Sequence, residues 1–174
     1  MKDTERKIIV FSDSHGVSYN MERVFALHSD ADAFIHLGDG AREFNKLCKL
    51  RGKVGYSLLG NCDSSFLCLF ADTPHAVYTI GGKRFFMTHG NAYGVKSGKE
   101  ELLKVAAERC PDADFVLYGH THVSENSYLS EASGFEKPIY LINPGSISRP
   151  REGDPSYAII LIKGENVLTN VAHI

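Results

Sequence analysis

The spacing of apolar and polar positions changes repeatedly along the first sixty residues. Continuous apolar runs at residues 7–12, 33–37 and 55–59 predict strands buried on both faces. Between them, residues 19–28 and 43–50 place apolar side chains at helical spacing. Strands separated by helices favour a parallel sheet with right-handed crossovers.

The remainder of the chain is richer in strand patterns. Residues 75–80 and 83–88 flank Gly81-Gly82, which is a strong signal for a two-residue hairpin. The clearest helix is predicted at residues 98–110 and is ended by Pro111. Further strands are predicted at residues 114–118, 138–142, 157–163 and 167–171. We therefore expect more antiparallel pairing here, and a single domain over residues 1–174 with two packed sheets and helices outside.

Composition narrows the classes of function. Hydrophobic residues make up 43% of the 174 residues, enough for a substantial core. A net charge of −2 gives no global positive field, so we expect no stable nucleic-acid binding and no membrane binding. The charged N-terminus lacks the apolar segment of a signal peptide, and no run approaches the roughly 20 residues of a membrane span. A cytoplasmic protein is predicted.

Two further features concern cysteines and apolar residues. No pair of cysteines has Cys-x-x-Cys spacing, which argues against a thiolate zinc site and favours free thiols. A cluster of Phe66, Leu67, Leu69 and Phe70 is interpreted as part of a core element, with a self-association face as the alternative. A homo-oligomer, dimer or tetramer, is compatible with that alternative.

Five polar motifs, each placed just after an apolar run, carry the candidate chemistry. Because parallel strands present their carboxyl ends at one edge of a sheet, we expect these motifs to converge there. Carboxylate, amide and imidazole ligands without a thiolate favour manganese first, with iron, zinc, magnesium, nickel and cobalt as alternatives. The motifs are Asp13-Ser-His15, Gly38-Asp39, Gly60-Asn61-Cys62-Asp63, His89-Gly90 and Gly119-His120-Thr-His122.

Each motif taken alone also has a purely structural interpretation. Asp13 could cap a turn, the segment around Asn61 could itself be a turn, and His120 and His122 could lie on one side of a polar strand. The occurrence of all five motifs in one short chain favours the metal site. The remaining histidines follow no such turn and are assigned to the surface or to satisfied core positions; they are His28, His36, His75 and His173.

The order and spacing of these motifs resemble those of the calcineurin-like metallophosphoesterase superfamily, in particular its small prokaryotic phosphodiesterase branch. The resemblance extends from Asp13 to the Asn143-Pro-Gly-Ser146 segment. It implies an α/β fold that is a four-layer αββα sandwich, with two mixed sheets flanked by helices. It also implies a centre with two metal ions: Asp13, His15 and His122 hold one, Asn61, His89 and His120 hold the other, and Asp39 bridges both.

The expected activity follows from such a centre. Two cations about 3.5–4 Å apart can clamp the attacking and leaving oxygens at phosphorus and generate hydroxide at neutral pH. We expect a metal-dependent phosphoesterase, and within that class a phosphodiesterase acting on a small phosphate ester. Asp39, Asn61 and Asp63 are the expected catalytic residues, with Asp63 orienting a histidine ligand. Alternatives are a phosphomonoesterase or nucleotidase on the same site, and a non-catalytic scaffold such as the retromer subunit of this fold.

Substrate contacts are less clear in the sequence. Many superfamily members have histidine, thought to protonate the leaving group, where this chain has Cys62, whereas the small phosphodiesterase branch has cysteine there. Because a thiol is a weak acid and a poor donor, we expect either esters whose leaving group needs little protonation or protonation by water or another residue. Tyr93 and Lys96 could rim the pocket or lie on an ordinary loop. Likewise, Arg42, Arg149 and Arg151 could bind phosphate or be solvated.

Overall fold

The computed structural model describes residues 5–63 and 74–174 and contains two five-stranded sheets. The first has the order β10-β9-β1-β2-β3, in which β1, β2 and β3 are parallel as predicted and β9 pairs antiparallel with both β1 and β10. Its strands are β1 (Arg6–Phe11), β2 (Ala33–His36), β3 (Gly55–Ser57), β9 (Ser156–Lys163) and β10 (Asn166–His173).

The second sheet has the order β4-β5-β6-β8-β7. The β4–β5 hairpin forms at the predicted residues, and β5, β6 and β8 are parallel, so this sheet is mixed, as the family resemblance implied. In the second half of the chain the antiparallel pairs β4–β5, β7–β8, β1–β9 and β9–β10 outnumber these parallel pairs, which confirms the expected richness in antiparallel pairing. An edge strand, β7, was not predicted. The strands are β4 (His75–Ile80), β5 (Lys83–Thr88), β6 (Phe115–Leu117), β7 (Ser124–Leu129) and β8 (Ile139–Pro144).

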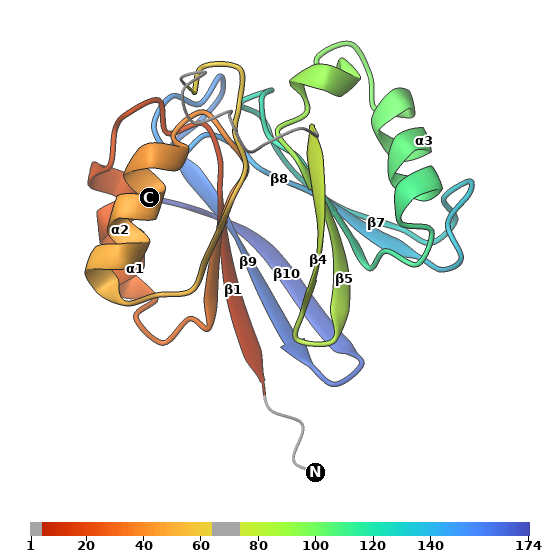
Figure 1. The fold of residues 1–174 in the computed structure, drawn as a ribbon, viewed down its shortest axis with the longest axis horizontal. Coiled ribbons are helices and arrows are strands. Elements are labelled where there is room, and N and C mark those ends of the chain that lie inside the picture. Colours follow the sequence, from red (N-terminus) through yellow and green to blue (C-terminus); the bar gives the residue numbers. More distant parts are fainter. Residues whose placement is uncertain (1–4, 64–73) are drawn as a thin grey trace.

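The two sheets face each other, and helices cover their outer faces (Figure 1). Helices α1 (Tyr19–Leu27) and α2 (Ala41–Arg51) pack on the first sheet, and α3 (Glu100–Arg109) packs on the second. A short 3-10 helix, η2 (Asn91–Tyr93), follows β5. The four-layer αββα arrangement expected from the family resemblance is therefore confirmed.

Strand β1 shows why its last four residues, Ile8 to Phe11, are all apolar. Ile8 and Val10 pack into the core between the sheets, whereas Ile9 and Phe11 pack under the helices. A strand covered on both faces has no solvent side, so alternation is lost. Full burial of such side chains contributes about 1.5–3 kcal/mol each. This central position fixes the loop that follows β1.

Three further expectations concern the cysteines, an apolar cluster and membrane spans. Cys48 and Cys110 are buried free thiols, and burial raises the pKa of Cys48 to about 11. The cluster of Phe66, Leu67, Leu69 and Phe70 lies outside the described residues, as does Cys68. Within the described ranges, no helix combines the length and apolar character needed to cross a bilayer.

Candidate metal centre

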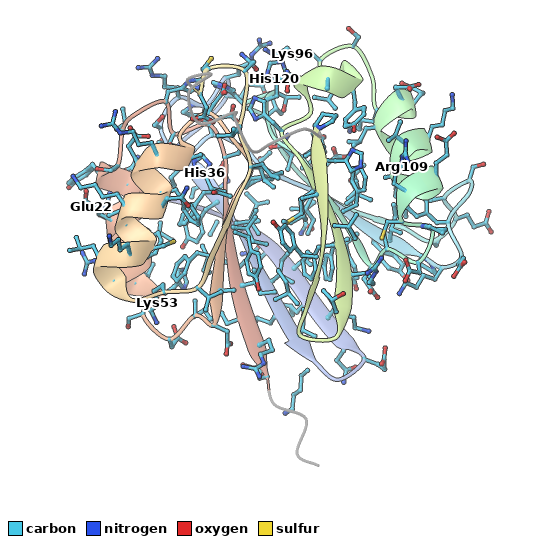
Figure 2. All side chains as sticks on the ribbon, in the orientation of Figure 1. Glu22, His36, Lys53, Lys96, Arg109 and His120 are labelled. Carbon is cyan, nitrogen blue, oxygen red and sulfur yellow. The ribbon has the colours of Figure 1, made fainter. Side chains whose placement is uncertain are left out.

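All seven predicted ligands lie beyond the carboxyl ends of strands, at one end of the sandwich. The first sheet supplies four of them after β1, β2 and β3, and the second supplies three after β5 and β6. Figure 2 labels His120 at this end. The seven are Asp13, His15, Asp39, Asn61, His89, His120 and His122.

A first group of donors joins the loops after β1 and β6. His15 Nε2 lies 3.1 Å from His122 Nε2, and His122 Nε2 lies 3.3 Å from Asp13 Oδ1. His15 Nε2 is 3.9 Å from the same Asp13 oxygen. These three atoms are close enough together to be ligands of a single metal ion.

A second group surrounds His89. Its Nε2 lies 3.4 Å from Asp39 Oδ2, 3.2 Å from Asn61 Oδ1 and 3.2 Å from His120 Nδ1. Asp39 Oδ2 is also 3.9 Å from His15 Nε2, which belongs to the first group. Asp39 therefore stands between the two groups of donors.

The chemistry of these donors fits divalent cations. Asp13 Oδ1 is buried without a hydrogen-bond partner among the described residues, an arrangement that is costly unless a cation completes it. His89 Nδ1 donates to the Leu37 carbonyl at 3.0 Å, and His122 Nδ1 donates to the Arg149 carbonyl at 2.6 Å. With the proton held on Nδ1, the Nε2 lone pair of each ring points into the centre, as metal ligation requires.

Electrostatics within the centre favour bound positive charge. Burial raises the pKa of Asp39, but the hydrogen bond and positive charge of His89 outweigh burial and hold that pKa below its usual range. Burial lowers the pKa of His89, yet the hydrogen bond to Asp39 and the charge of Asp13 leave it raised. The interaction with the nearby Asp13 carboxylate likewise raises the pKa of His122. Protons on these imidazoles balance the carboxylates, and metal ions would displace them.

The backbone is strained at five of the seven ligands. Among the described residues these are the only non-glycine positions with positive φ, a conformation that most side chains disfavour. Such strain persists where the surroundings over-determine it and concentrates at functional sites. The residues and their φ values are Asp13 at 55°, His15 at 46°, Asp39 at 58°, His120 at 68° and His122 at 60°.

Hydrogen bonds between neighbouring loops hold this strained backbone. The amides of Asp13 and His15 donate to the carbonyls of Gly38 and Asp39 at 3.0 and 2.7 Å. The amide of His120 donates to Asp13 Oδ2 at 3.0 Å, which ties a loop of the second sheet to a loop of the first. The ligand loops thus support one another directly.

Asp63 has a different role from the one predicted. Its Oδ2 accepts the amides of Asp39 and Gly60, both at 2.8 Å, and its Oδ1 accepts those of Gly40 and Ala41 at 2.9 and 3.2 Å. All its hydrogen bonds within residues 5–63 and 74–174 are to backbone amides, so the expectation that it orients a histidine is wrong. It fixes the loop carrying Asp39, because a partly buried carboxylate binds four converging N–H groups strongly.

Gly38 and Gly60 allow these loops to approach each other. A Cβ atom on Gly60 would lie 2.1 Å from Asp39 Oδ1, and one on Gly38 would lie 2.8 Å from His89 Nδ1. Both distances are below van der Waals contact, so any larger residue would displace a ligand. Gly38 and Gly60 are therefore required because a side chain at either position would clash with a ligand.

Three polar residues in and after β8 support the centre. The family resemblance included Asn143 and Ser146 but gave them no role, and Ser148 was missed. The hydroxyls of Ser146 and Ser148 donate to the Asp13 carbonyl at 2.7 and 3.2 Å. The buried Asn143 amide donates to the Gly119 carbonyl at 3.1 Å. The available signal was the polar stretch beginning at Asn143, directly after the apolar residues of β8.

The other histidines do not join the two ligand groups. His36 is fully buried, with Nδ1 accepting from the Gly38 amide and Nε2 beside Ser14 Oγ, and burial lowers its pKa to about 4. His28 lies 2.9 Å from the Tyr157 hydroxyl, and His75 lies 2.6 Å from the Tyr93 hydroxyl. All three have structural contacts, although His28 Nδ1 is buried without a hydrogen-bond partner among the described residues.

Cys62 lies at the edge of the centre. Its amide donates to Asp39 Oδ1 at 2.7 Å, and its sulfur lies within 4.8 Å of donor atoms of both His15 and Asp39. Burial, followed by the hydrogen bond and negative charge of Asp39, raises the pKa of the thiol. The side chain is therefore protonated at neutral pH in the metal-free protein.

Two hollows flank the centre. One, of about 250 Å³, lies beside Cys62 and includes Arg42; the other, of about 370 Å³, includes Lys96 and Arg151. Tyr93 is buried and engaged with His75, so it does not offer a face to either hollow.

Comparison with known proteins agrees with this architecture. Residues 7–165 match the family model of the calcineurin-like phosphoesterase superfamily domain. The chain is 31% identical to the probable metallophosphoesterase YsnB of Bacillus subtilis, over 91% of this chain and 85% of that protein. It is 29% identical to the phosphodiesterase YfcE of Escherichia coli K12, over 95% and 97%.

A solved structure extends the likeness to three dimensions. The crystal structure of a conserved Streptococcus pneumoniae TIGR4 protein, described there as a predicted phosphoesterase, superimposes with a TM-score of 0.76 at 28% identity. The match covers 98% of this chain and 90% of that one. The chain therefore belongs to the calcineurin-like phosphoesterase superfamily.

Proposed function

We propose that this protein is a phosphodiesterase whose centre holds two divalent metal ions, with manganese as the first candidate. The observation that carries the proposal is the position of Asp39 between two separate groups of donors, 3.4 Å from His89 Nε2 and 3.9 Å from His15 Nε2. A shared carboxylate is what a pair of neighbouring cations needs. The name of the relative YfcE supports the choice of diester hydrolysis.

Each residue of the centre has a defined task in this proposal. Asp13, His15 and His122 hold one ion; Asn61, His89 and His120 hold the other; Asp39 is common to both. Ions held there supply Lewis-acid catalysis, polarising phosphoryl oxygens and lowering the pKa of water. Asp63 keeps the Asp39 loop in place, and the Nδ1 hydrogen bonds of His89 and His122 keep their lone pairs directed inward.

Cys62 bears on the kind of ester that is cut. A thiol is a poor hydrogen-bond donor and gives little help to a leaving group that needs a proton. Aryl and other acidic leaving groups are therefore expected to react faster than simple alkyl ones.

The test uses protein stripped with a chelator and reloaded with Mn²⁺. We expect hydrolysis of bis(p-nitrophenyl) phosphate, and slower hydrolysis of the monoester p-nitrophenyl phosphate, at equal concentration. Folding is checked by circular dichroism, and Asp39→Asn serves as the inactive control. A folded protein with about two bound metal equivalents that cleaves neither ester would falsify the proposal and favour a scaffold; faster monoester cleavage would favour a phosphomonoesterase.

A further inference from the structure

The larger of the two hollows lies beside the loop that carries His120 and His122. It lies between the segment before α3, the end of β6 and the start of β7, with a volume of about 370 Å³. Thr121, which lines it, stands in the chain between the predicted ligands His120 and His122. The other polar residues lining it are Lys96, Lys99, Tyr118, Ser124, Glu125 and Arg151.

Only part of the positive charge in this hollow is neutralised. Lys99 Nζ lies 2.6 Å from Glu125 Oε2, and Glu125 also accepts from the Tyr118 hydroxyl. Lys96 and Arg151 form no ion pair and no side-chain hydrogen bond with any residue in the two described ranges. The hollow therefore presents two uncompensated cations.

Both cations lie close to the metal ligands. Lys96 is drawn near His120 in Figure 2, and its charge acts on the rings of both His120 and His122. The backbone amide of Arg151 donates to the His122 carbonyl at 3.1 Å. A group attached to a phosphoryl centre at the metals would need few bonds to reach either residue.

The hollow beside Cys62 has the opposite character. Apart from the predicted metal ligands His15 and Asp39, its charged residues are one cation, Arg42, and two carboxylates, Glu43 and Asp63. An anionic substituent would be repelled there and attracted on the Lys96 side. The difference in charge between the two hollows therefore favours one orientation of a bound diester, with its anionic substituent on the Lys96 side.

We propose that the hollow lined by Lys96 and Arg151 is an anion subsite, which takes a phosphate or carboxylate carried by one substituent of the phosphodiester. The preferred substrate is thus a diester with a second anionic group. Because about 370 Å³ is at the small end of ligand sites, that substituent is of glycerol or sugar size. This inference rests on the proposed phosphodiesterase activity and specifies its substrate class.

The kinetic test uses p-nitrophenyl phosphodiesters that share a leaving group. Their second substituents are ethyl, 2-carboxyethyl, 2-phosphoethyl and choline, which are neutral, anionic, anionic and cationic. We expect kcat/KM to be highest for the anionic esters and lowest for the choline ester in the Mn²⁺-loaded protein. The two anionic esters distinguish a carboxylate preference from a phosphate preference.

Variants connect that preference to the two residues. Lys96→Gln and Arg151→Gln should each lower the anionic-to-ethyl ratio of kcat/KM about fivefold, and the double variant about twentyfold, as expected for partly exposed charge-assisted contacts. Lys104→Gln, an exposed charge on the outer side of α3, is the matched control and should leave the ratio unchanged. Equal ratios in wild type and variants, or a fall in the control as well, would overturn the subsite.

A binding measurement separates this inference from the proposed function. Calorimetry with the metal-loaded protein compares 2-carboxyethylphosphonate with ethylphosphonate, neither of which is hydrolysed. Tighter binding of the former that depends on Lys96 supports the subsite even if no diester is cleaved. Equal binding of the two phosphonates rejects the subsite even if the diesterase activity is found.

Discussion

The two sheets bring different chemistry to the same centre. Loops of the first sheet carry both carboxylates, the amide of Asn61 and one imidazole, whereas loops of the second carry imidazoles alone. Each donor group nevertheless takes ligands from both sheets. Oxygen donors and imidazoles respond differently to mutation and pH, so the two sides of the centre can be tested separately.

The largest effect is expected on the carboxylate side. Asp39→Asn keeps the size of the residue and removes the negative charge that both donor groups share. We expect kcat/KM to fall about a thousandfold, or about 4 kcal/mol of transition-state stabilisation, with loss of both metals. Metal analysis alongside kinetics checks this, and retention of two equivalents would contradict the shared role.

A smaller effect is expected on the imidazole side. His122→Gln removes a donor from one group only and leaves the group around His89 intact. We expect about one bound metal equivalent and a loss of about a hundredfold in activity. Equal losses for His122→Gln and Asp39→Asn would remove the distinction between the two sides.

Asp63→Asn tests the support of the carboxylate side. An amide has one acceptor oxygen, and its NH₂ group would face backbone N–H donors, so the Asp39 loop should loosen. Because Asp63 acts on the centre only through the loop that carries Asp39, we expect a loss of activity of about ten- to hundredfold. Asp114→Asn is the control, because Asp114 also accepts a backbone amide but lies at the opposite end of β6; an equal loss there would count against a local role.

Lowering the pH should weaken the imidazole side first. The pKa values of His89 and His122 are raised and those of Asp13 and Asp39 are lowered, so protons compete with metal at the imidazoles while the carboxylates stay ionised. Mn²⁺ affinity should therefore drop as pH falls from 8 to 6, by about tenfold per displaced proton and pH unit. Calorimetry in buffers of different ionisation enthalpy measures the proton release, and pH-independent affinity would refute this expectation.

The smallest effect on activity is expected at His36, which lies beneath the centre. Its pKa is lowered from 6.5 to about 4, so its contribution to stability is present above pH 6.5 and is lost as pH falls toward 4. Between pH 7 and 5 this amounts to about 2 kcal/mol of unfolding free energy. Urea unfolding of His36→Gln should show a correspondingly smaller decrease, whereas His173→Gln should unfold as wild type does.

The sequence predicted the central strands well because they are buried on both faces. The continuous apolar run of β1 is typical of a strand that is buried on both faces. β7 was missed because its residues, Ser-Glu-Asn-Ser-Tyr-Leu, are mostly polar and lie at a sheet edge. The parallel pairing of β5, β6 and β8 was missed since partners distant in the chain leave no local signal.

The candidate ligands could be predicted because their side chains are the signal. The roles of the residues that support these ligands could not be predicted. Asp63 binds backbone amides and Ser146 binds a backbone carbonyl, and these are groups that nearly every residue carries. The difference in charge between the two hollows could not be predicted from the sequence either. They depend on Lys99 pairing with Glu125 while Lys96 remains unpaired, which only the folded chain decides.

The left-handed backbone conformation of the ligands affects which residues these positions can acquire during evolution. Glycine would relax the chain at His15, Asp39 or His120, so selection for folding alone pulls these positions toward glycine. Only a demand for their side chains opposes that pull. A lineage that abandoned catalysis should accumulate glycine at these positions and become harder to unfold, which makes the positions a record of whether a relative still uses its metals.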